Sequence, residues 1–239
     1  SISESRIFIN GPTGSGKELI ARKIHKESQR QTGPFVILNG ALLDIKKYEQ
    51  ELFGEEKNNG EISYGALEKA TGGILLIDEI SEIPLETQSK ILRVLIDQKF
   101  KRINGNHDIS VNVRIICTSS KNIKKEIEFG NFREDLYHRL NVFEINIEPL
   151  KNRISDISLL VKYFSKKISF NYHLKKLDID TNNNYLLNYD WPGNVRELRN
   201  LIERIAILSP DSSDKISNII KESLKTPEVD TSLAEKAFS

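Results

Sequence analysis

Seven residues near the start of the chain have the types and spacing that can hold a chain of phosphates. They run Gly11, Pro12, Thr13, Gly14, Ser15, Gly16 and Lys17, and Glu18 follows; the spacing is G-x-x-x-x-G-K. Glycines allow successive backbone N–H groups to face one point, and a following helix directs its positive end there. The apolar run before the loop and the helix-like run after it supply the required context. The motif therefore predicts a nucleotide site in which Lys17 reaches the outer phosphates.

Two adjacent carboxylates provide the second half of such a site. Asp78 and Glu79 follow four apolar residues, 74–77, which read as a buried strand beside the loop. Asp78 is expected to hold Mg²⁺ directly or through water, and Glu79 to orient and deprotonate the attacking water. Ordinary acids at a strand end are the alternative, which the presence of the loop disfavours. Glu18 stands where a generic phosphate loop has the Ser or Thr that binds Mg²⁺.

Two arginines form a third candidate group. Arg133 and Arg139 lie six residues apart among acidic side chains. The planar guanidinium suits bidentate recognition of a terminal phosphate. By itself the stretch is more typical of a solvated amphipathic helix, so both interpretations stay open on the residues alone.

The elements that must position these groups follow from hydrophobic periodicity. Short β-branched runs alternate with helical stretches, which favours a parallel sheet with helices on both faces, an α/β core over residues 1–149. The expected strands are 6–9, 35–38, 74–78, 113–118 and 142–147, and the expected helices are 17–30 and 85–98. The loop and both acids then lie at strand ends.

Beyond Pro149 the strand pattern stops. Helices are expected over 154–170, 182–189 and 195–208, the last opened by Pro192-Gly193-Asn194, so residues 150–209 form a small all-helical lid. Residues 210–239 read as a linker, with 233–238 as the expected start of a further domain. The absence of methionine favours a domain excised from the interior of a longer protein.

Composition limits the partners. The formal net charge is +1, so no global basic field favours nucleic acid, and we expect another segment to bind DNA.

The single cysteine, Cys117, is expected in the core, and the four histidines lack metal-ligand spacing. No apolar run has the length of a membrane span and no signal peptide opens the chain. These features predict a cytoplasmic protein with no membrane partner.

Taken together with Glu51-Leu52-Phe53-Gly54, the run from Phe129 to Val142, and Trp191-Pro192-Gly193-Asn194-Val195-Arg196-Glu197-Leu198, these motifs closely resemble the AAA+ domain of bacterial sigma-54 enhancer-binding proteins. The resemblance extends from Arg6 to Leu208. It implies a P-loop ATPase core plus a helical lid, assembled as a ring with active sites between subunits. In this family Glu also follows the loop lysine.

The resemblance implies a role for several residues. Arg133 and Arg139 match arginines that reach a neighbour's site in trans, and Asn39 matches the asparagine that restrains the catalytic glutamate. Arg196 matches the lid arginine that touches the nucleotide. Ser119 and Ser120 occupy the positions, usually Thr-Asn, that sense the terminal phosphate.

One segment departs from the family. Where members carry the Gly-Ala-Phe-Thr-Gly-Ala loop that contacts sigma-54, this chain has the shorter run 55–64, Glu-Glu-Lys-Asn-Asn-Gly-Glu-Ile-Ser-Tyr, which reads as a solvated surface loop. The departure resembles NtrX-type nitrogen-regulation response regulators. That likeness implies an N-terminal receiver domain, a C-terminal helix-turn-helix domain, a sensor histidine kinase and RNA polymerase as partners.

Two hypotheses remain open. One is an ATPase whose cycle rearranges a ring in a transcription regulator that does not remodel sigma-54 polymerase. The other is a nucleotide-gated assembly module with little hydrolysis. A sigma-54 activator with a divergent contact loop is a third possibility.

Overall fold

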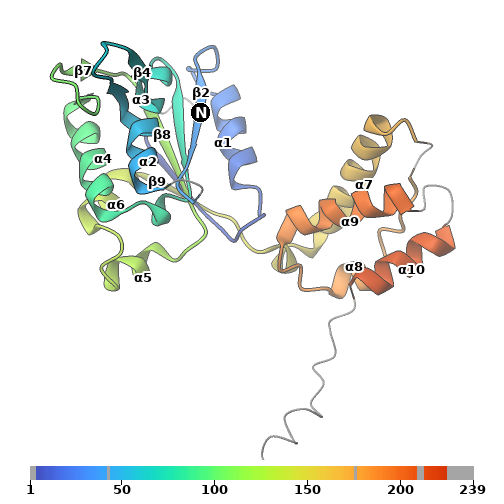
Figure 1. The fold of residues 1–239 in the computed structure, drawn as a ribbon. Helices are drawn as coiled ribbons and strands as arrows, with labels where there is room; N and C mark the ends of the chain where they lie inside the picture. Colours follow the sequence, from blue (N-terminus) through green and yellow to red (C-terminus); the bar gives the residue numbers. More distant parts are fainter. Residues whose placement is uncertain (1–3, 42–43, 175–176, 209–212, 225–239) are drawn as a thin grey trace, which may run out of the picture. The chain divides into compact units, whose positions relative to one another are not determined.

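The apolar runs form one parallel sheet, as the sequence predicts. Its strands are β1 (Ile7–Asn10), β2 (Phe35–Asn39), β5 (Ile74–Asp78), β8 (Arg114–Ser119) and β9 (Phe143–Asn146). They lie in the order β2-β5-β8-β1-β9 (Figure 1). The fold class, a five-stranded parallel sheet with helices on both faces, is confirmed.

The structure is a computed structural model that describes residues 4–41, 44–174, 177–208 and 213–224. It divides between Glu148 and Pro149 into two compact units. The first holds the sheet and the second is helical. None of the helices in these ranges is both long and apolar enough to cross a bilayer.

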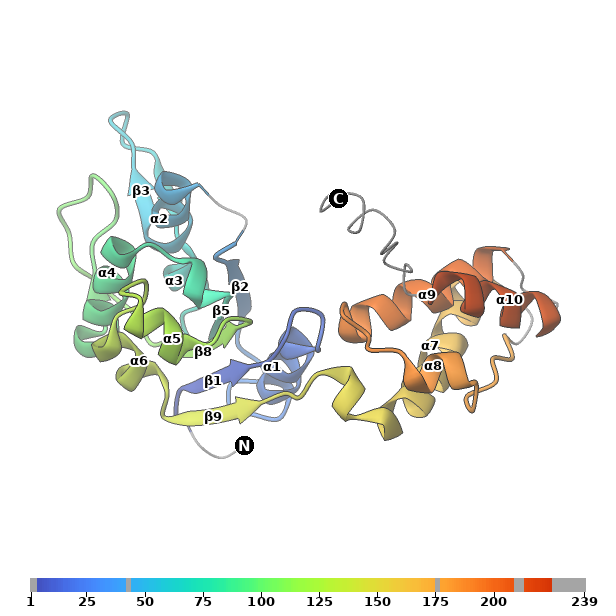
Figure 2. The same ribbon diagram turned by 90° about the horizontal axis from the view of Figure 1, so that it is seen from below.

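Alternate residues of each strand face opposite sides of the sheet. On one side Ile7, Ile9 and Leu76 pack with Ala21 of α1 (Lys17–Lys26). On the other side Phe8, Leu75 and the buried Cys117 pack with the remaining helices of this unit. Figure 2 shows β1 and β9 running side by side. The expectation that Cys117 is a core residue is confirmed, and burial raises the pKa of its thiol.

The sheet order corrects one expectation. Asp78 does not end the strand beside the phosphate loop, because β8 lies between β5 and β1. The carboxyl ends of all three parallel strands nevertheless lie at one edge, where ligands of such sheets bind. The end of β8 therefore lies between the loop and the two acids.

Several short elements complete the first unit. The helices are α2 (Ile45–Phe53), α3 (Ala66–Lys69), α4 (Leu85–Asp97), α5 (Ile123–Glu128) and α6 (Glu134–Leu140), with a 3₁₀ turn at Ile80–Glu82. Two hairpins pair β3 (Gly54–Glu56) with β4 (Ile62–Tyr64), and β6 (Lys99–Phe100) with β7 (Ile109–Ser110). The run expected to be a surface loop, 55–64, is thus mostly the hairpin β3–β4. Its tip is exposed.

The helical unit is built around one buried tryptophan. After a 3₁₀ turn at Leu150–Asn152 come α7 (Ile154–Asn171), α8 (Asn184–Asn188) and α9 (Asn194–Leu208). Trp191 is 1% exposed and its indole N–H donates to the Leu186 carbonyl at 2.9 Å. The Glu197 carboxylate accepts from the Gly193 N–H at 2.8 Å, which satisfies a free donor at the start of α9. The Pro-Gly-Asn signal therefore marks a helix start, as predicted.

The segment expected to be a linker contains a further helix. α10 spans Ser213–Ser223, and its Ile216 and Ile220 lie in the same core as α7 and α9. The polar composition of the segment hides an apolar stripe at i, i+3, i+4 and i+8, formed by Ile216, Ile219, Ile220 and Leu224, by which the helix packs.

We predict that Ile220→Ala lowers the free energy of unfolding of the helical unit by about 2–4 kcal/mol, because it removes buried methyl groups. Lys221→Ala, on the exposed side of the same helix, is the matched control and should change it by less than about 0.5 kcal/mol. Urea unfolding followed by circular dichroism measures both. Equal stabilities of the two variants would mean that α10 does not pack.

Candidate functional site

The phosphate loop leaves the carboxyl end of β1 and turns directly into α1. Gly14 and Gly16 have φ of 77° and 103°, in the left-handed region that glycine adopts without strain. A Cβ on Gly11 would lie 2.9 Å from Ile147, so glycine is also required there by close packing. The loop can thus turn tightly, so that its backbone surrounds the space in front of the first turn of α1.

Lys17 is the buried cation of the loop. Its side chain is 6% exposed, and its Nζ donates to the Gly11 carbonyl at 2.9 Å. The same nitrogen lies 3.0 Å from Oε1 of Glu79. The structure therefore brings together the predicted loop lysine and the second predicted acid.

Two further loop residues differ in their surroundings. The hydroxyl of Ser15 is buried and has no hydrogen-bond partner among the described residues. A phosphate oxygen would satisfy it, so the loop fits a polyanion. Glu18 points away into an exposed ion pair with Arg22 at 2.7 Å.

Asp78 is held by two neighbouring strands. The hydroxyl of Thr118, on β8, donates to Oδ1 at 2.5 Å, and Nδ2 of Asn39, on β2, donates to Oδ2 at 3.4 Å. Asn39 and Asp78 are register partners in the sheet. A carboxylate oriented in this way could bind Mg²⁺, a cation that uses one or two carboxylates beside phosphate oxygens.

Glu79 has a different set of partners. Its Oε2 accepts from the backbone N–H of Ser120 at 2.7 Å and from the Ser120 hydroxyl at 2.8 Å. Partial burial acts to raise the pKa of Glu79, but the hydrogen bonds from Lys17 and Ser120 and the Lys17 charge together hold the pKa below its ordinary value. The ionised form, which a general base needs, is favoured.

The predicted arginines lie apart from this cluster. Arg133 precedes α6 and makes two hydrogen bonds to Asp135, at 3.0 and 2.7 Å. The backbone carbonyl of Arg139 accepts from Nη1 of Arg6 at 3.4 Å, and Arg6 precedes β1. The backbone of Arg139 therefore lies near the amino end of β1. The phosphate loop follows the carboxyl end of the same strand.

Arg196 lies on α9 of the helical unit and is exposed. Its contact with a nucleotide stays a prediction.

Sequence reasoning missed two residues that position the others. Thr118 orients Asp78 and also accepts from the Glu79 N–H at 3.0 Å. Gln88 is fully buried. Its Nε2 donates to the Ile83 carbonyl at 2.8 Å and to the Asn131 carbonyl at 3.0 Å, and its Oε1 accepts from the Arg133 N–H at 2.9 Å. Two features of the sequence could have indicated these residues. Thr118 is a polar residue at the end of an apolar strand, and Gln88 is a glutamine on the apolar face of a helix.

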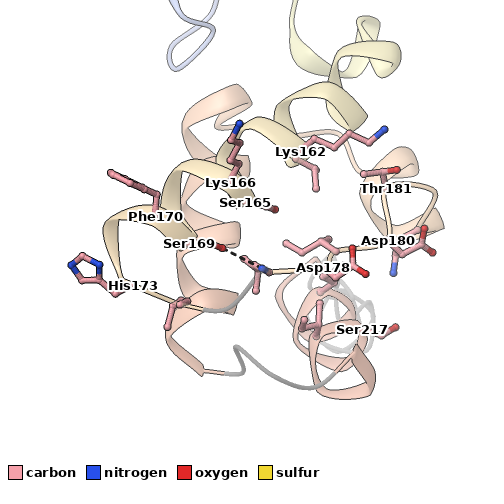
Figure 3. Close-up of a pocket in the computed structure, with 17 residues that line it drawn as sticks. Lys162, Ser165, Lys166, Ser169, Phe170, His173, Asp178, Asp180, Thr181 and Ser217 are labelled. Carbon is pink, nitrogen blue, oxygen red and sulfur yellow. Dashed lines mark hydrogen bonds between the residues drawn. The ribbon is translucent and has the colours of Figure 1, made fainter.

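The helical unit contains a large open cavity, shown in Figure 3, of about 1360 Å³. Its walls come from α7, α10 and the chain between α7 and α8, and include Lys162, Ser165 and Asp180. Ser169 also lines the cavity and accepts from the Leu177 N–H at 3.2 Å, the dashed line in Figure 3. All lining residues belong to the helical unit, so this cavity contains none of the predicted phosphate-binding residues.

The P-loop geometry, the sheet order and the separate helical unit define an AAA+ ATPase fold. In agreement, residues 1–146 match the sigma-54 interaction domain family and residues 151–235 match the AAA+ ATPase lid domain family. The chain belongs to the family of sigma-54 interaction domains.

Particular relatives narrow this class. The nitrogen assimilation regulatory protein NtrX of Azorhizobium caulinodans is 47% identical over 214 residues, which are 89% of this chain and 47% of that protein. The regulatory protein AtoC of Escherichia coli is 42% identical, over 87% of this chain and 46% of that protein. The crystal structure of NtrX from Brucella abortus in complex with ATP is 41% identical with a TM-score of 0.88, covering 98% of this chain and 54% of that one. The chain spans about half the length of the relatives that it matches.

We predict that Gln88→Leu lowers the free energy of unfolding by about 1–3 kcal/mol, because an apolar side chain of similar size leaves one buried and two partly buried backbone groups without their partner. The amides of Asn131 to Arg133 should also exchange faster with solvent deuterium. Ser89 is the matched control, because its half-buried hydroxyl donates to the Leu85 carbonyl of the same helix and accepts from the Arg133 side chain, without any contact to the backbone at 131–133 among the described residues. Ser89→Ala should leave both measurements almost unchanged. Wild-type exchange in Gln88→Leu would contradict this role.

Proposed function

We propose that this chain is the ATP-binding and ATP-hydrolysing domain of a bacterial two-component transcription regulator of the NtrX type. The observation that carries the proposal is the contact between Lys17 of the phosphate loop and Glu79 at 3.0 Å. It brings a phosphate-binding cation and a general base to the same edge of the sheet. Crystal structures of NtrX from Brucella abortus in complex with ADP and with ATP support the choice of nucleotide.

In this proposal each side chain has one task. The loop from Gly11 to Glu18 binds the phosphates, Asp78 holds Mg²⁺, and Glu79 accepts the proton of the attacking water. The magnesium ion, when bound, neutralises charge that develops on the phosphates. Thr118 and Asn39 would hold the Asp78 carboxylate in one orientation for this role.

We further propose that the site is completed by a second copy of the chain. The carbonyl of Arg139 accepts a hydrogen bond from Arg6, which lies at the amino end of β1. Lys17 lies beyond the carboxyl end of that strand. A four-residue strand is about 13 Å long. This placement supports delivery of Arg133 and Arg139 to a neighbour's phosphates in an oligomer, with Arg196 of the lid contacting the nucleotide. Receiver and helix-turn-helix domains, a sensor kinase and promoter DNA complete the proposed context.

The contact with sigma-54 polymerase is proposed to be absent. The hairpin β3–β4 ends in a turn closed by a 3.0 Å ion pair between Lys57 and Glu61, and residues 55–64 contain no Phe-Thr pair. Arg102 also ties the hairpin down: it donates twice to Glu68, at 2.9 and 2.6 Å, and once to Glu56, at 2.9 Å. A contact loop must extend and withdraw, and these bonds oppose both movements.

Backbone bonds strengthen the same attachment. The Glu56 N–H donates to the Ile103 carbonyl at 3.0 Å, and the Ile103 N–H donates to the Gly54 carbonyl at 2.9 Å. The two protruding hairpins are therefore joined into one body.

Because we propose no contact with sigma-54 polymerase, we also propose that the protein acts through DNA occupancy at promoters read by the housekeeping polymerase.

The catalytic part of the proposal predicts that ATPase activity per subunit rises with protein concentration. Arg139→Ala and Lys17→Ala should each lose turnover, and a mixture should regain part of it, because one subunit supplies the arginine and the other the loop. A coupled phosphate-release assay measures this.

Lys17→Ala should also lose most of its affinity for a fluorescent ATP analogue, whereas Lys23→Ala, a 74% exposed lysine of the same helix, should bind as the wild type does. Failure of every mixture to recover activity, with assembly proven by light scattering, would favour a site complete within one chain. Tight binding without turnover in the wild type would favour the nucleotide-gated assembly module.

The polymerase part predicts that the full-length protein forms no ATP-dependent open complexes with sigma-54 polymerase on a promoter carrying its binding sites. The reason is the short, tied hairpin without an aromatic tip. In vitro transcription beside a relative known to open such promoters measures it. Open complexes that vanish when residues 57–61 are replaced by two glycines would identify a divergent sigma-54 activator.

A further inference from the structure

Glu144, an exposed carboxylate on β9, accepts hydrogen bonds from two segments that belong to different parts of the proposed site. Its Oε1 accepts from Nδ2 of Asn10 at 2.7 Å, and its Oε2 accepts from Nδ2 of Asn141 at 3.1 Å. Asn10 ends β1, and Asn141 directly follows α6. One carboxylate therefore joins the strand that leads into the phosphate loop to the helix that carries Arg139.

The sheet brings these groups to one of its faces. Phe8 and Glu144 are register partners in parallel strands, so their side chains lie on the same face, and Asn10 follows Phe8 by two residues. Tyr137 of α6 packs edge-on against Phe8, with ring centroids 5.9 Å apart. Helix α6 thus lies over this face of β1 and β9, where Glu144 can reach its end.

The loop end of this connection has other supports. The carbonyl of Asn10 accepts from the Ile147 N–H at 2.8 Å, and the N–H of the next residue, Gly11, donates to the Ser119 carbonyl at 3.2 Å. These backbone bonds hold the start of the loop in the sheet without the Asn10 side chain. Loss of Glu144 should therefore leave the loop in place.

The helix end depends more on Glu144. Two hydrogen bonds hold the last turn of α6 and its cap beside β1 and β9: the one from Asn141 to Glu144, and one from Nη1 of Arg6 to the Arg139 carbonyl at 3.4 Å. The second is longer than is usual for a hydrogen bond. Glu144 therefore supplies the stronger polar attachment of the turn that contains Arg139.

We propose that Glu144 is a positioning residue that sets where Arg139 is offered to a neighbouring subunit, because it ties the end of α6 to the strand of the donor's own phosphate loop. The inference rests on the proposed ATPase site shared between two copies of the chain. It assigns a task to Asn10, Asn141 and Glu144, to which the sequence motifs gave none.

The experiment uses mixtures in which each kind of subunit supplies only one half of the site. Lys17→Ala subunits supply Arg139 without a working loop, and Arg139→Ala subunits supply the loop without that arginine. Turnover recovered on mixing therefore comes from sites shared between the two kinds. Glu144→Ala added to the Lys17→Ala subunits should lower the recovered kcat about tenfold with KM for ATP almost unchanged, because the arginine is displaced. The same change added to the Arg139→Ala subunits should alter kcat by less than about twofold.

Two further variants, each placed in the Lys17→Ala subunits, separate positioning from general damage. Glu144→Gln keeps an oxygen that accepts from Asn10, and its amide nitrogen can donate to Oδ1 of Asn141, which is buried without a partner among the described residues. This variant should restore most of kcat. Asn146→Ala is the matched control, because Asn146 is exposed on the same strand and its side chain makes no hydrogen bond within the described ranges. It should stay within about twofold of the parent mixture.

Equal losses from Glu144→Ala in the two kinds of subunit would overturn the inference, since a merely structural role weakens both. Full recovery with the change in the Lys17→Ala subunits would overturn it too and leave the shared site intact. So would a loss that Glu144→Gln fails to restore.

If the parent mixture shows no turnover, the proposed shared site fails and a second measurement decides the contact. The amides of Asn141 and Val142 donate to the Tyr137 and Leu140 carbonyls. They should exchange with solvent deuterium about tenfold faster in Glu144→Ala than in the wild type, because the end of α6 is released. Equal exchange in the two proteins would show that Glu144 does not hold α6.

Discussion

The site depends on one ion pair between side chains that are almost buried. Lys17 and Glu79 come from segments about sixty residues apart and are 6% and 15% exposed. Two charges removed from water are costly unless they are paired and hydrogen-bonded. Glu79 is also held by Ser120, and Lys17 by the Gly11 carbonyl, so neither charge is left unsatisfied. Neither side chain can leave the ion pair unless another charged or polar group takes the place of its partner. For Lys17, the phosphates of a nucleotide would be that group.

The rest of the first unit orders the groups around this pair. Strand β8 separates the loop strand from the acidic strand, so the residues at its end touch both acids: Thr118 holds Asp78 and Ser120 holds Glu79. The loop and the two acids are therefore joined by an ion pair and hydrogen bonds, in addition to the apolar packing of the strands. In the same unit, Gln88 accepts from the Arg133 N–H and fixes the backbone there.

Much of this could be predicted from the sequence, for a physical reason. The five strands are apolar and β-branched, and the phosphate loop needs glycines at fixed places, so local patterns suffice for both. Partners across the sheet could not be predicted in the same way. Whether Asn39 faces Asp78 or Glu79 depends on the register of β2 against β5, and the contacts of Thr118 and Ser120 depend on the position of β8 between β5 and β1. No local pattern contains either. α10 was missed because the polar composition of its segment concealed four apolar residues at helical spacing, Ile216, Ile219, Ile220 and Leu224.

The attachment of the hairpin β3–β4 has a consequence for protein engineering. The turn from Lys57 to Glu61 is exposed and closed by its own hydrogen bond, from the Lys57 N–H to the Glu61 carbonyl at 2.9 Å. Its base is fixed by Arg102 and by Gly65, where an added Cβ would lie 2.4 Å from the Gly54 nitrogen. An exposed tip on a fixed base is the kind of place where chains accept inserted sequences. The bond between Asn58 and Asn59 is therefore a natural position for a foreign peptide or a fluorescent reporter, presented at a fixed place on the surface while the nucleotide site stays intact.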